Sequence, residues 1–200
     1  MPFWVVFADL DGTLLDENYS FEHAKDALEL FRRKEIFLVP VSSKSFLETS
    51  TWSQRIGGIE VFSYEGGFGI GVKIGSPFLD SIVEEAKKIG YRPNEIEDKV
   101  LLEFDRDEVE KRIRGFFYRF DIYPKFISGM SIEEIVRITG LSREDAALAR
   151  DRRGPSPFLI REETKDILIR LAEKRGLFVS RGRFFMIIAP FHKGFSVRVI

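Results

Sequence analysis

The stretch Trp4-Val5-Val6-Phe7-Ala8-Asp9-Leu10-Asp11-Gly12-Thr13-Leu14-Leu15 decides the fold expected for this chain. Its apolar half predicts a strand that is buried on both faces of a sheet and ends at a glycine turn. Residues two apart in an extended segment point the same way, so the carboxylates of Asp9 and Asp11 project together from the carboxyl end of this strand. Ligands of open parallel α/β sheets bind at that edge. The spacing therefore predicts two acids in one active site, one suited to nucleophilic attack and one to proton transfer.

The composition is compatible with a soluble enzyme and excludes several other classes of protein. The chain has 200 residues with 31 Lys or Arg and 32 Asp or Glu, so no net charge favours nucleic acid or a membrane as a partner. No apolar run is long enough to cross a bilayer and no secretory leader precedes the first strand, which predicts a cytoplasmic protein. With no cysteine and only His23 and His192, the sequence excludes disulfides, thiolate nucleophiles and histidine-rich metal sites.

The segments that follow predict a Rossmann-like parallel sheet. Helical spacing covers residues 21–34 and 45–55, and apolar runs at 36–41 and 59–63 predict the second and third strands. Strands that alternate with helices form parallel sheets with crossover connections. The glycine run from Gly66 to Gly71 lacks the spacing of a dinucleotide-binding loop and predicts a turn into a small hairpin.

Beyond residue 74 the periodicity changes and predicts an inserted α+β cap. We expect a first domain over 1–74, the cap over 75–188, and a return to the first domain over 189–200. The pattern over 107–120 is helical and is expected to become an aromatic strand near Gly115. The other elements expected in the cap are helices at 78–89, 131–137, 142–150 and 162–174, strands at 100–104 and 159–160, and a hairpin of 177–180 with 183–188.

The run Asp9-Leu10-Asp11-Gly12-Thr13-Leu14 resembles the first motif, D-x-D-G-T-L, of the haloacid dehalogenase superfamily of phosphohydrolases. The resemblance implies an Mg²⁺-dependent phosphatase in which Asp9 is the nucleophile, Asp11 is the proton shuttle, and both belong to the metal site. It also implies catalytic roles for Ser42, which follows the second strand, and for Lys193, within His192-Lys193-Gly194. From the residues alone, an ordinary helix cap is the preferred interpretation of Ser42.

Further stretches resemble the Cof-like branch of that superfamily, and within it the mannosyl-3-phosphoglycerate phosphatase family. Ser42-Ser43-Lys44 matches its S-S-K motif, and Glu65-Gly66-Gly67 is similar to an E-N-G turn. The stretch at 150–158 loosely resembles R-E-Y-S-E-P-F, and the stretch at 181–184 resembles G-G-R-F. The substrate-binding residues that this implies are Ser43, Lys44, Glu65, Gly66, Gly67, Arg150, Ser156 and Arg183.

Arginine suits such a role because its planar fork binds carboxylate and phosphate through two hydrogen bonds. A solvated helix end that complements the helix dipole is the alternative for Arg150 to Arg153. The fourth motif of the superfamily, G-D-x-x-N-D, is not found before Ile200. We therefore expect a core that is incomplete at its carboxyl end, weak Mg²⁺ binding, and self-association or a complementing fragment as a partner.

The function expected from these stretches is hydrolysis of a small phosphorylated sugar, with mannosyl-3-phosphoglycerate as the best candidate and mannosylglycerate as its product. The alternative is a catalytically inactive relative that retains only a cleft for a sugar phosphate.

Overall fold

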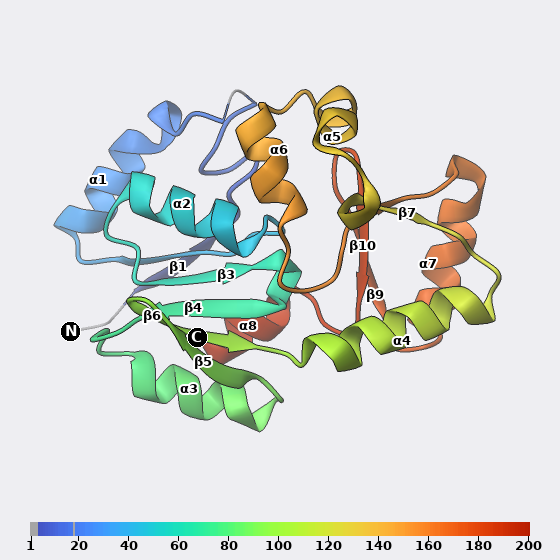
Figure 1. Cartoon of the computed structure of the whole chain (residues 1–200). Helices are drawn as coiled ribbons and strands as arrows, with labels where there is room; N and C mark the ends of the chain where they lie inside the picture. The colour runs from blue at the N-terminus through green and yellow to red at the C-terminus, as the bar shows by residue number, and fades with distance from the viewer. Residues whose placement is uncertain (1–3, 18) are drawn as a thin grey trace.

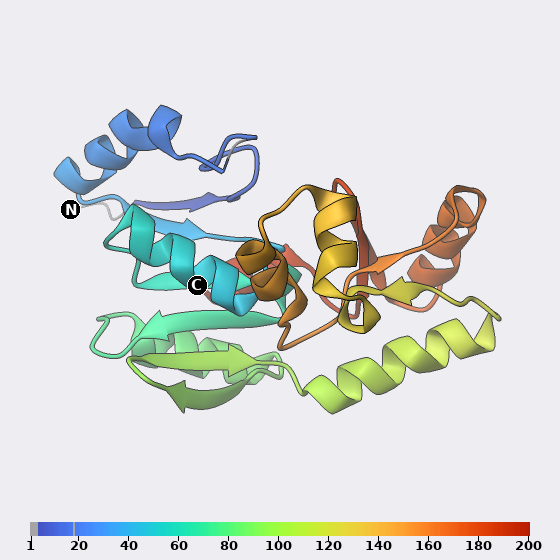
Figure 2. The same cartoon turned by 45° about the horizontal axis from the view of Figure 1, so that its top comes forward.

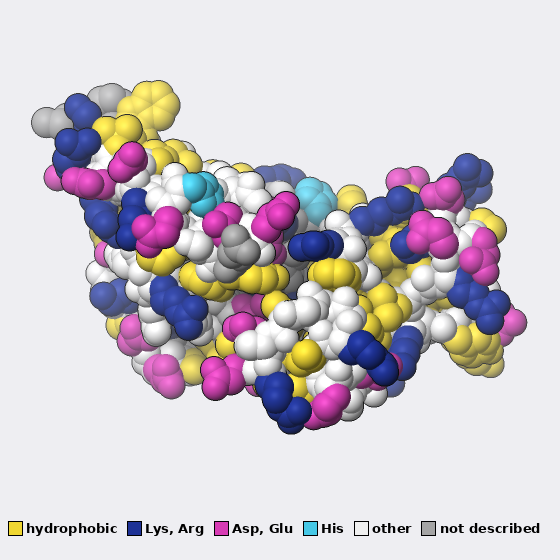
Figure 3. All heavy atoms as spheres, turned by 90° about the horizontal axis from the view of Figure 1, so that it is seen from above, with side chains coloured by type: hydrophobic (Ala, Val, Ile, Leu, Met, Phe, Trp, Pro, Cys, Tyr) yellow, Lys and Arg dark blue, Asp and Glu magenta, His cyan; other side chains and the backbone are white. Residues whose placement is uncertain are grey.

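The computed structural model describes residues 4–17 and 19–200, so residues 1–3 and 18 of the predicted first domain lie outside the described residues. Figures 1 and 2 show two parts side by side, one containing α1 to α3 and α8, the other containing α4 to α7. Within the described ranges, no helix has the length and apolar character needed to span a membrane. Acidic and basic side chains are interspersed on the face seen in Figure 3.

The first part contains the parallel strands that the sequence predicts. Strands β1 (Val5–Ala8) and β2 (Phe37–Pro40) pair in parallel, and a parallel bridge between Val41 and Ser63 joins β2 to β3 (Val61–Tyr64). A 3-10 turn (Glu22–Ala24) and helix α1 (Lys25–Arg33) connect β1 to β2, and α2 (Phe46–Ile56) connects β2 to β3. The mixed α/β architecture with parallel strands is therefore confirmed.

Strand β1 is less buried than predicted. The side chains of Trp4 and Phe7 are 65% and 37% exposed. The apolar cluster beside this strand includes Val5 but does not extend to Phe7. The expectation that β1 is buried along its whole length on both faces is therefore wrong at Phe7, because no apolar side chain of that cluster covers it.

The sheet continues past the third strand into residues that were expected in the cap. Its order is β3, β4 (Gly69–Lys73), β6 (Lys99–Glu103), β5 (Arg92–Ile96), and these neighbours are antiparallel. A 3-10 turn (Glu65–Gly67) joins β3 to β4, which confirms the predicted hairpin. Helix α3 (Leu79–Lys88) packs its Ile82 and Ala86 against the same sheet. The predicted boundary after residue 74 thus falls inside a continuous sheet, because β4 pairs with β6.

The second part is an α+β layer, as the sequence predicts. Its strands form one antiparallel sheet in the order β7, β8, β10, β9, and the hairpin of β9 with β10 is the one expected. The elements are α4 (Arg106–Arg119), β7 (Lys125–Phe126), a 3-10 turn (Ile127–Gly129), α5 (Ile132–Thr139), α6 (Arg143–Arg150), β8 (Phe158–Leu159), a 3-10 turn (Glu162–Thr164), α7 (Lys165–Glu173), β9 (Phe178–Arg181) and β10 (Met186–Ala189).

Helix α4 is continuous, so the predicted change to a strand near Gly115 is wrong. The helix begins where the Asp105 side chain accepts a hydrogen bond from the main-chain nitrogen of Glu108. A Cβ atom built on Gly115 would have no other atom within 4 Å, so no neighbouring segment requires a glycine at this position. The aromatic residues continue the buried helical face, which comprises Val109, Ile113, Phe116 and Phe117.

One apolar cluster joins the two parts. It combines Phe62, Tyr64 and Phe68 of the first part with the inward face of α4 and with Met186 and Ile188 of β10. After β10 the chain returns to the first part as α8 (Lys193–Val199). A buried hydrogen bond of 2.7 Å between the hydroxyls of Ser63 on β3 and Ser196 on α8 holds that helix in place.

Candidate active site

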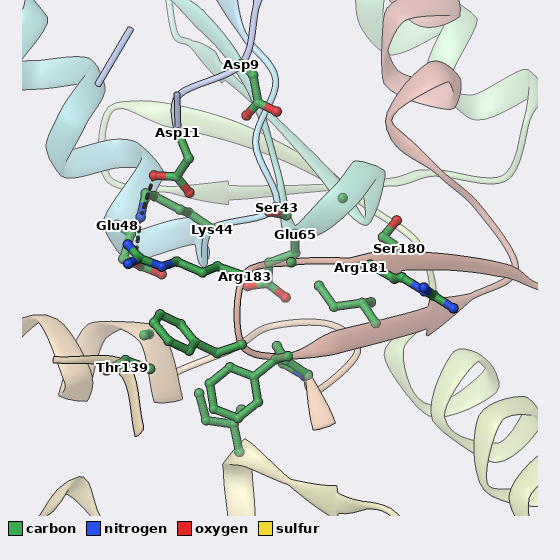
Figure 4. A pocket seen from close by; sticks show the side chains of 18 of the residues that line it. Asp9, Asp11, Ser43, Lys44, Glu48, Glu65, Thr139, Ser180, Arg181 and Arg183 are labelled. Carbon is green, nitrogen blue, oxygen red and sulfur yellow. Dashed lines mark hydrogen bonds and ion pairs between the residues drawn. The ribbon is translucent and has the colours of Figure 1, made fainter. Parts of the chain in front are cut away.

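A cavity of about 790 Å³ opens between the two parts of the molecule. Its lining combines residues that follow β1 and β2 with residues of α5, β9, β10 and the loop between these two strands. Figure 4 shows the acids Asp9 and Asp11 on one side of it and Arg183 reaching in from the other. Of the predicted site residues, the lining includes Asp9, Asp11, Ser43, Lys44, Glu65, Gly66, Arg183 and Lys193.

Asp9 and Lys193 meet although 184 positions separate them in the chain. Asp9 follows the last residue of β1, and Lys193 is the first residue of α8. The Lys193 Nζ lies 2.5 Å from Asp9 Oδ2, and Asp9 Oδ1 accepts a hydrogen bond of 2.8 Å from the main-chain nitrogen of Leu10. Both side chains remain partly exposed, at 43% for Asp9 and 36% for Lys193. A carboxylate at the cavity wall with a cation beside it can approach an anionic group such as a phosphate.

Asp11 lies beside a buried lysine. The Nζ of Lys44 is 3.2 Å from Asp11 Oδ1 and 3.4 Å from Glu48 Oε1, and it sits 4.5 Å from the centre of the Tyr19 ring. Burial alone lowers the pKa of Lys44, but Glu48 and Asp11 more than offset this and leave that pKa raised. Lys44 is therefore a protonated, nearly buried cation that holds the Asp11 carboxylate in place.

Glu48 is a wall residue that was not among the predicted site residues. The Ser45 hydroxyl accepts a hydrogen bond from the Glu48 nitrogen (3.2 Å), and Glu48 Oε2 accepts one from the Ser45 nitrogen (2.9 Å). This reciprocal pair starts α2 and fixes Glu48 on the cavity wall. Two signals in the sequence could have found it, the S-x-x-E spacing from Ser45 and the i,i+4 spacing from Lys44.

Ser42 and Ser43 are placed differently from each other. Ser42 is fully buried and does not line the cavity, and its hydroxyl accepts a hydrogen bond of 3.1 Å from the main-chain nitrogen of Lys44. Ser43 does line the cavity, and its carbonyl accepts a hydrogen bond of 2.9 Å from Arg152. In this structure the Ser42 hydroxyl therefore shapes the turn after β2, and the cap of the following helix α2 is Ser45 rather than Ser42.

The turn Glu65–Gly67 borders the cavity at two of its three residues. Glu65 and Gly66 line it, whereas Gly67 does not. Gly67 has φ +101°, and a Cβ atom built on it would lie 2.5 Å from the carbonyl oxygen of His192. Glycine is therefore required here, because the turn packs against the backbone that leads into Lys193.

The arginines of the cap are only partly where the sequence places them. Arg150 is the exposed last residue of α6 and does not line the cavity. Ser156 is also outside the lining, and its hydroxyl is bonded to Ser128 instead. Arg152 does line the cavity, with a side chain that is 6% exposed. The loose match over 150–158 carries an extra residue, so it could not decide which arginine of the run turns inward.

Arg183 reaches into the cavity from the loop between β9 and β10. Figure 4 shows its side chain extending toward Lys44 and Glu48, while Arg181 extends to the opposite side. Arg181 Nη2 donates a hydrogen bond of 2.9 Å to Asp166. Arg183 packs over Phe184, with its guanidinium carbon 5.2 Å from the ring centre. Of these two arginines, Arg183 is thus the one aimed at the acids of the first part.

The oxygen donors of the site are of the kind that Mg²⁺ prefers. Asp9 and Asp11 supply two carboxylates at one edge of the cavity. Within residues 4–17 and 19–200, no cluster of three or more His, Cys, Asp or Glu side chains is placed to hold a metal ion. Mg²⁺ commonly binds through one or two carboxylates together with a substrate phosphate. The donors present fit an ion that a phosphate group helps to hold.

Comparisons with known proteins agree with this geometry. No protein-family model matches the chain. A glucosyl-3-phosphoglycerate/mannosyl-3-phosphoglycerate phosphatase of Persephonella marina is 34% identical, over 98% of this chain and 71% of that protein. A protein of the same name from Methanococcoides burtonii is 30% identical, over 98% and 71% respectively. A solved phosphatase of the haloacid dehalogenase superfamily from Bacteroides thetaiotaomicron aligns with a TM-score of 0.52 and 14% identity, over 98% of this chain and 71% of that one.

Proposed function

The chain belongs to the glucosyl-3-phosphoglycerate/mannosyl-3-phosphoglycerate phosphatase family of the haloacid dehalogenase superfamily, and on this premise we propose its substrate and mechanism. The proposed reaction is removal of phosphate from a sugar phosphate that carries a glycerate group, with mannosyl-3-phosphoglycerate as the best candidate. The observation that carries the proposal is the pairing of Asp9 with Lys193, beside Asp11, in a cavity shared by the two parts of the molecule.

We propose that the reaction passes through a phosphorylated Asp9. A carboxylate oxygen of Asp9 forms a bond to phosphorus while the bond from phosphorus to the sugar-acid oxygen breaks. In this step Asp11 acts in its protonated carboxylic acid form and gives that proton to the departing oxygen, which leaves Asp11 as a carboxylate. Asp11 then takes a proton from a water molecule that attacks the phosphorus of the aspartyl-phosphate, which releases phosphate and restores Asp9. The cation of Lys193 balances the charge on the phosphoryl oxygens, and Lys44 keeps Asp11 oriented.

Magnesium is the cofactor proposed for this site. Asp9 through its carboxylate and Asp11 through its main-chain carbonyl would hold the ion together with the substrate phosphate, which leaves the Asp11 side chain available for proton transfer. When bound, the ion supplies positive charge that stabilises the charge developing on the phosphoryl group. Ser42 remains a proposed catalytic residue, and it would reach a phosphate only through a change from the turn in which it lies here.

Phosphate release from a panel of esters tests the proposed function. We expect the chain to release phosphate from mannosyl-3-phosphoglycerate and from glucosyl-3-phosphoglycerate once the Mg²⁺ concentration is high enough to offset the weak binding expected from the sequence, and we expect a chelator to abolish the release. The measurement is a continuous phosphate assay, with titration calorimetry of each sugar phosphate run alongside. Binding of a sugar phosphate without turnover at any Mg²⁺ concentration would favour the alternative, an inactive relative that retains only the cleft.

Arg183→Ala should weaken substrates that carry a carboxylate more than simple phosphate esters. Loss of a charge-assisted hydrogen bond to the glycerate carboxylate should cost about 1.5 to 3 kcal/mol of transition-state binding. The kcat/KM for mannosyl-3-phosphoglycerate should therefore fall by roughly 10- to 150-fold. Arg181→Ala is the matched control, because Arg181 comes from the same hairpin and donates to Asp166. Steady-state kinetics on mannosyl-3-phosphoglycerate and on 4-nitrophenyl phosphate show whether Arg183 acts on the glycerate carboxylate or on every phosphate ester. Equal losses on both esters would remove Arg183 from substrate selection.

A further inference from the structure

Glu65 is buried in an uncommon backbone conformation. Its side chain is fully buried, at 0% exposure, although it is an acid. Its φ of +50° lies in the left-handed region, which side chains larger than glycine, asparagine or aspartate rarely adopt. A residue is kept in such a conformation only where its surroundings hold it firmly. The contacts of the Glu65 carboxylate show what those surroundings are.

The carboxylate of Glu65 binds two other segments of the chain. Its Oε1 accepts hydrogen bonds from the main-chain nitrogens of Phe46 (3.2 Å) and Arg153 (3.0 Å). Its Oε2 accepts one of 2.6 Å from the main-chain nitrogen of Gly154 and lies 3.8 Å from Arg152 Nε. Glu65 therefore ties the end of β3 to the first residue of α2 and to residues 152–154, which lead from α6 of the cap to β8.

Two more polar contacts join the same segments. The Arg152 side chain donates a hydrogen bond of 2.9 Å to the carbonyl of Ser43, and the Ser45 hydroxyl donates one of 2.8 Å to the carbonyl of Leu148 in α6. The chain also passes so close at Gly154 that an added Cβ would lie 2.3 Å from the ring of Phe68. We call the set of Glu65 with Phe46, Arg152, Arg153 and Gly154 the clasp.

We propose that Glu65 is a positioning residue whose clasp sets how the cap sits over Asp9, so that the cap residues reach the part of the substrate away from the phosphate. This rests on the proposed phosphatase function. Both Glu65 oxygens are already engaged by main-chain nitrogens, so the carboxylate acts through the cap connection rather than on the substrate. Because Arg152 of the clasp also donates to the carbonyl of Ser43, the clasp couples the placement of the cap to the loop after β2.

Glu65→Gln tests this proposal with almost no change of shape. One carboxylate oxygen becomes an NH₂ group, which faces a main-chain N–H instead of accepting from it. Hydrogen exchange of the main-chain amides of Phe46, Arg153 and Gly154 should become at least about tenfold faster. The KM for mannosyl-3-phosphoglycerate should rise about tenfold, while kcat/KM for 4-nitrophenyl phosphate stays within about twofold of the parent value. Glu60→Gln is the matched control, because Glu60 accepts a hydrogen bond from Ser76 within the first part.

The outcomes separate the clasp from its alternatives. A rise in KM with unchanged exchange at Arg153 and Gly154 would make Glu65 a substrate ligand and overturn the proposal. Equal losses on both esters would also overturn it. If Glu65→Gln does not fold, exchange in the parent protein decides, since Phe46, Arg153 and Gly154 should be protected and should lose protection together as denaturant is added. Unprotected exchange at Arg153 and Gly154 would then refute the clasp. Failure of the parent to hydrolyse any ester would refute the proposed function and leave the exchange result standing.

Discussion

Asp9→Asn should reduce single-turnover phosphate release by more than about a thousandfold, which corresponds to at least about 4 kcal/mol of lost transition-state stabilisation. An amide is nearly the same shape as a carboxylate, but its oxygen is a poor nucleophile. The fold should persist because the Asp9 side chain is 43% exposed and its partner Lys193 is 36% exposed. Ion pairs exposed to this extent contribute about 0 to 1 kcal/mol to stability, so the unfolding free energy should change by no more than that.

Rapid quench in acid with peptide mass spectrometry gives a second readout for this variant. The parent should yield a phosphorylated peptide that contains Asp9, and Asp9→Asn should not. Asp26→Asn is a suitable control, since Asp26 is an exposed acid in the first turn of α1 and should leave the rate unchanged. Phosphate release by Asp9→Asn at the parent rate would eliminate the aspartyl-phosphate mechanism.

The first strand and its two acids could be predicted because several independent sequence signals indicate the same structure there. An apolar run, two carboxylates in alternate positions and a glycine turn together specify a strand with Asp9 and Asp11 at its end. The partner Lys193 could not be placed by spacing, because it enters the site only through the folding of the cap and the return of α8. It was found through a resemblance of motifs instead.

The elements that the sequence missed are those whose local signals were weak or conflicting. Strand β5 covers Arg92–Ile96, which is polar and contains Pro93, so it carries no apolar alternation. It forms because it lies at the edge of the sheet, where one side is free of strand partners in the described chain. At α4 the glycine and aromatic residues suggested a strand, but burial at helical spacing outweighed that local preference.

The candidate site was predicted at its centre and less well at its rim. Contacts made by the cap depend on the path of the loop that follows α6. Arg150 and Arg152 are only two positions apart in this stretch, yet Arg150 is exposed and the Arg152 side chain is buried. No periodic pattern sets the register of such a loop. The position of Glu48, in contrast, could be predicted from the sequence, because its spacing from Ser45 and Lys44 places all three residues at the start of one helix.

Asp11→Asn should lower hydrolysis of mannosyl-3-phosphoglycerate by about 100- to 10,000-fold, the range typical of a lost general acid and base. The departing sugar-acid oxygen is a poor leaving group unless it is protonated as the bond to phosphorus breaks. The oxygen of 4-nitrophenol leaves readily without a proton, so formation of the phosphorylated Asp9 from 4-nitrophenyl phosphate should slow by only about tenfold. Attack by water on that intermediate still needs Asp11 as a base, and this second step should become the slow one.

Stopped-flow absorbance with 4-nitrophenyl phosphate distinguishes the two steps in Asp11→Asn. We expect a burst of about one equivalent of 4-nitrophenol per active site, followed by slow steady release of phosphate. Lys44→Met provides the comparison, because it removes the cation 3.2 Å from Asp11 while Asp11 itself keeps its carboxyl group. That variant should lose less activity than Asp11→Asn on the sugar phosphate and should show no burst. If the burst of 4-nitrophenol in Asp11→Asn were slowed as much as sugar-phosphate hydrolysis, Asp11 would act by orienting the substrate phosphate, since only a proton transfer depends on the leaving group.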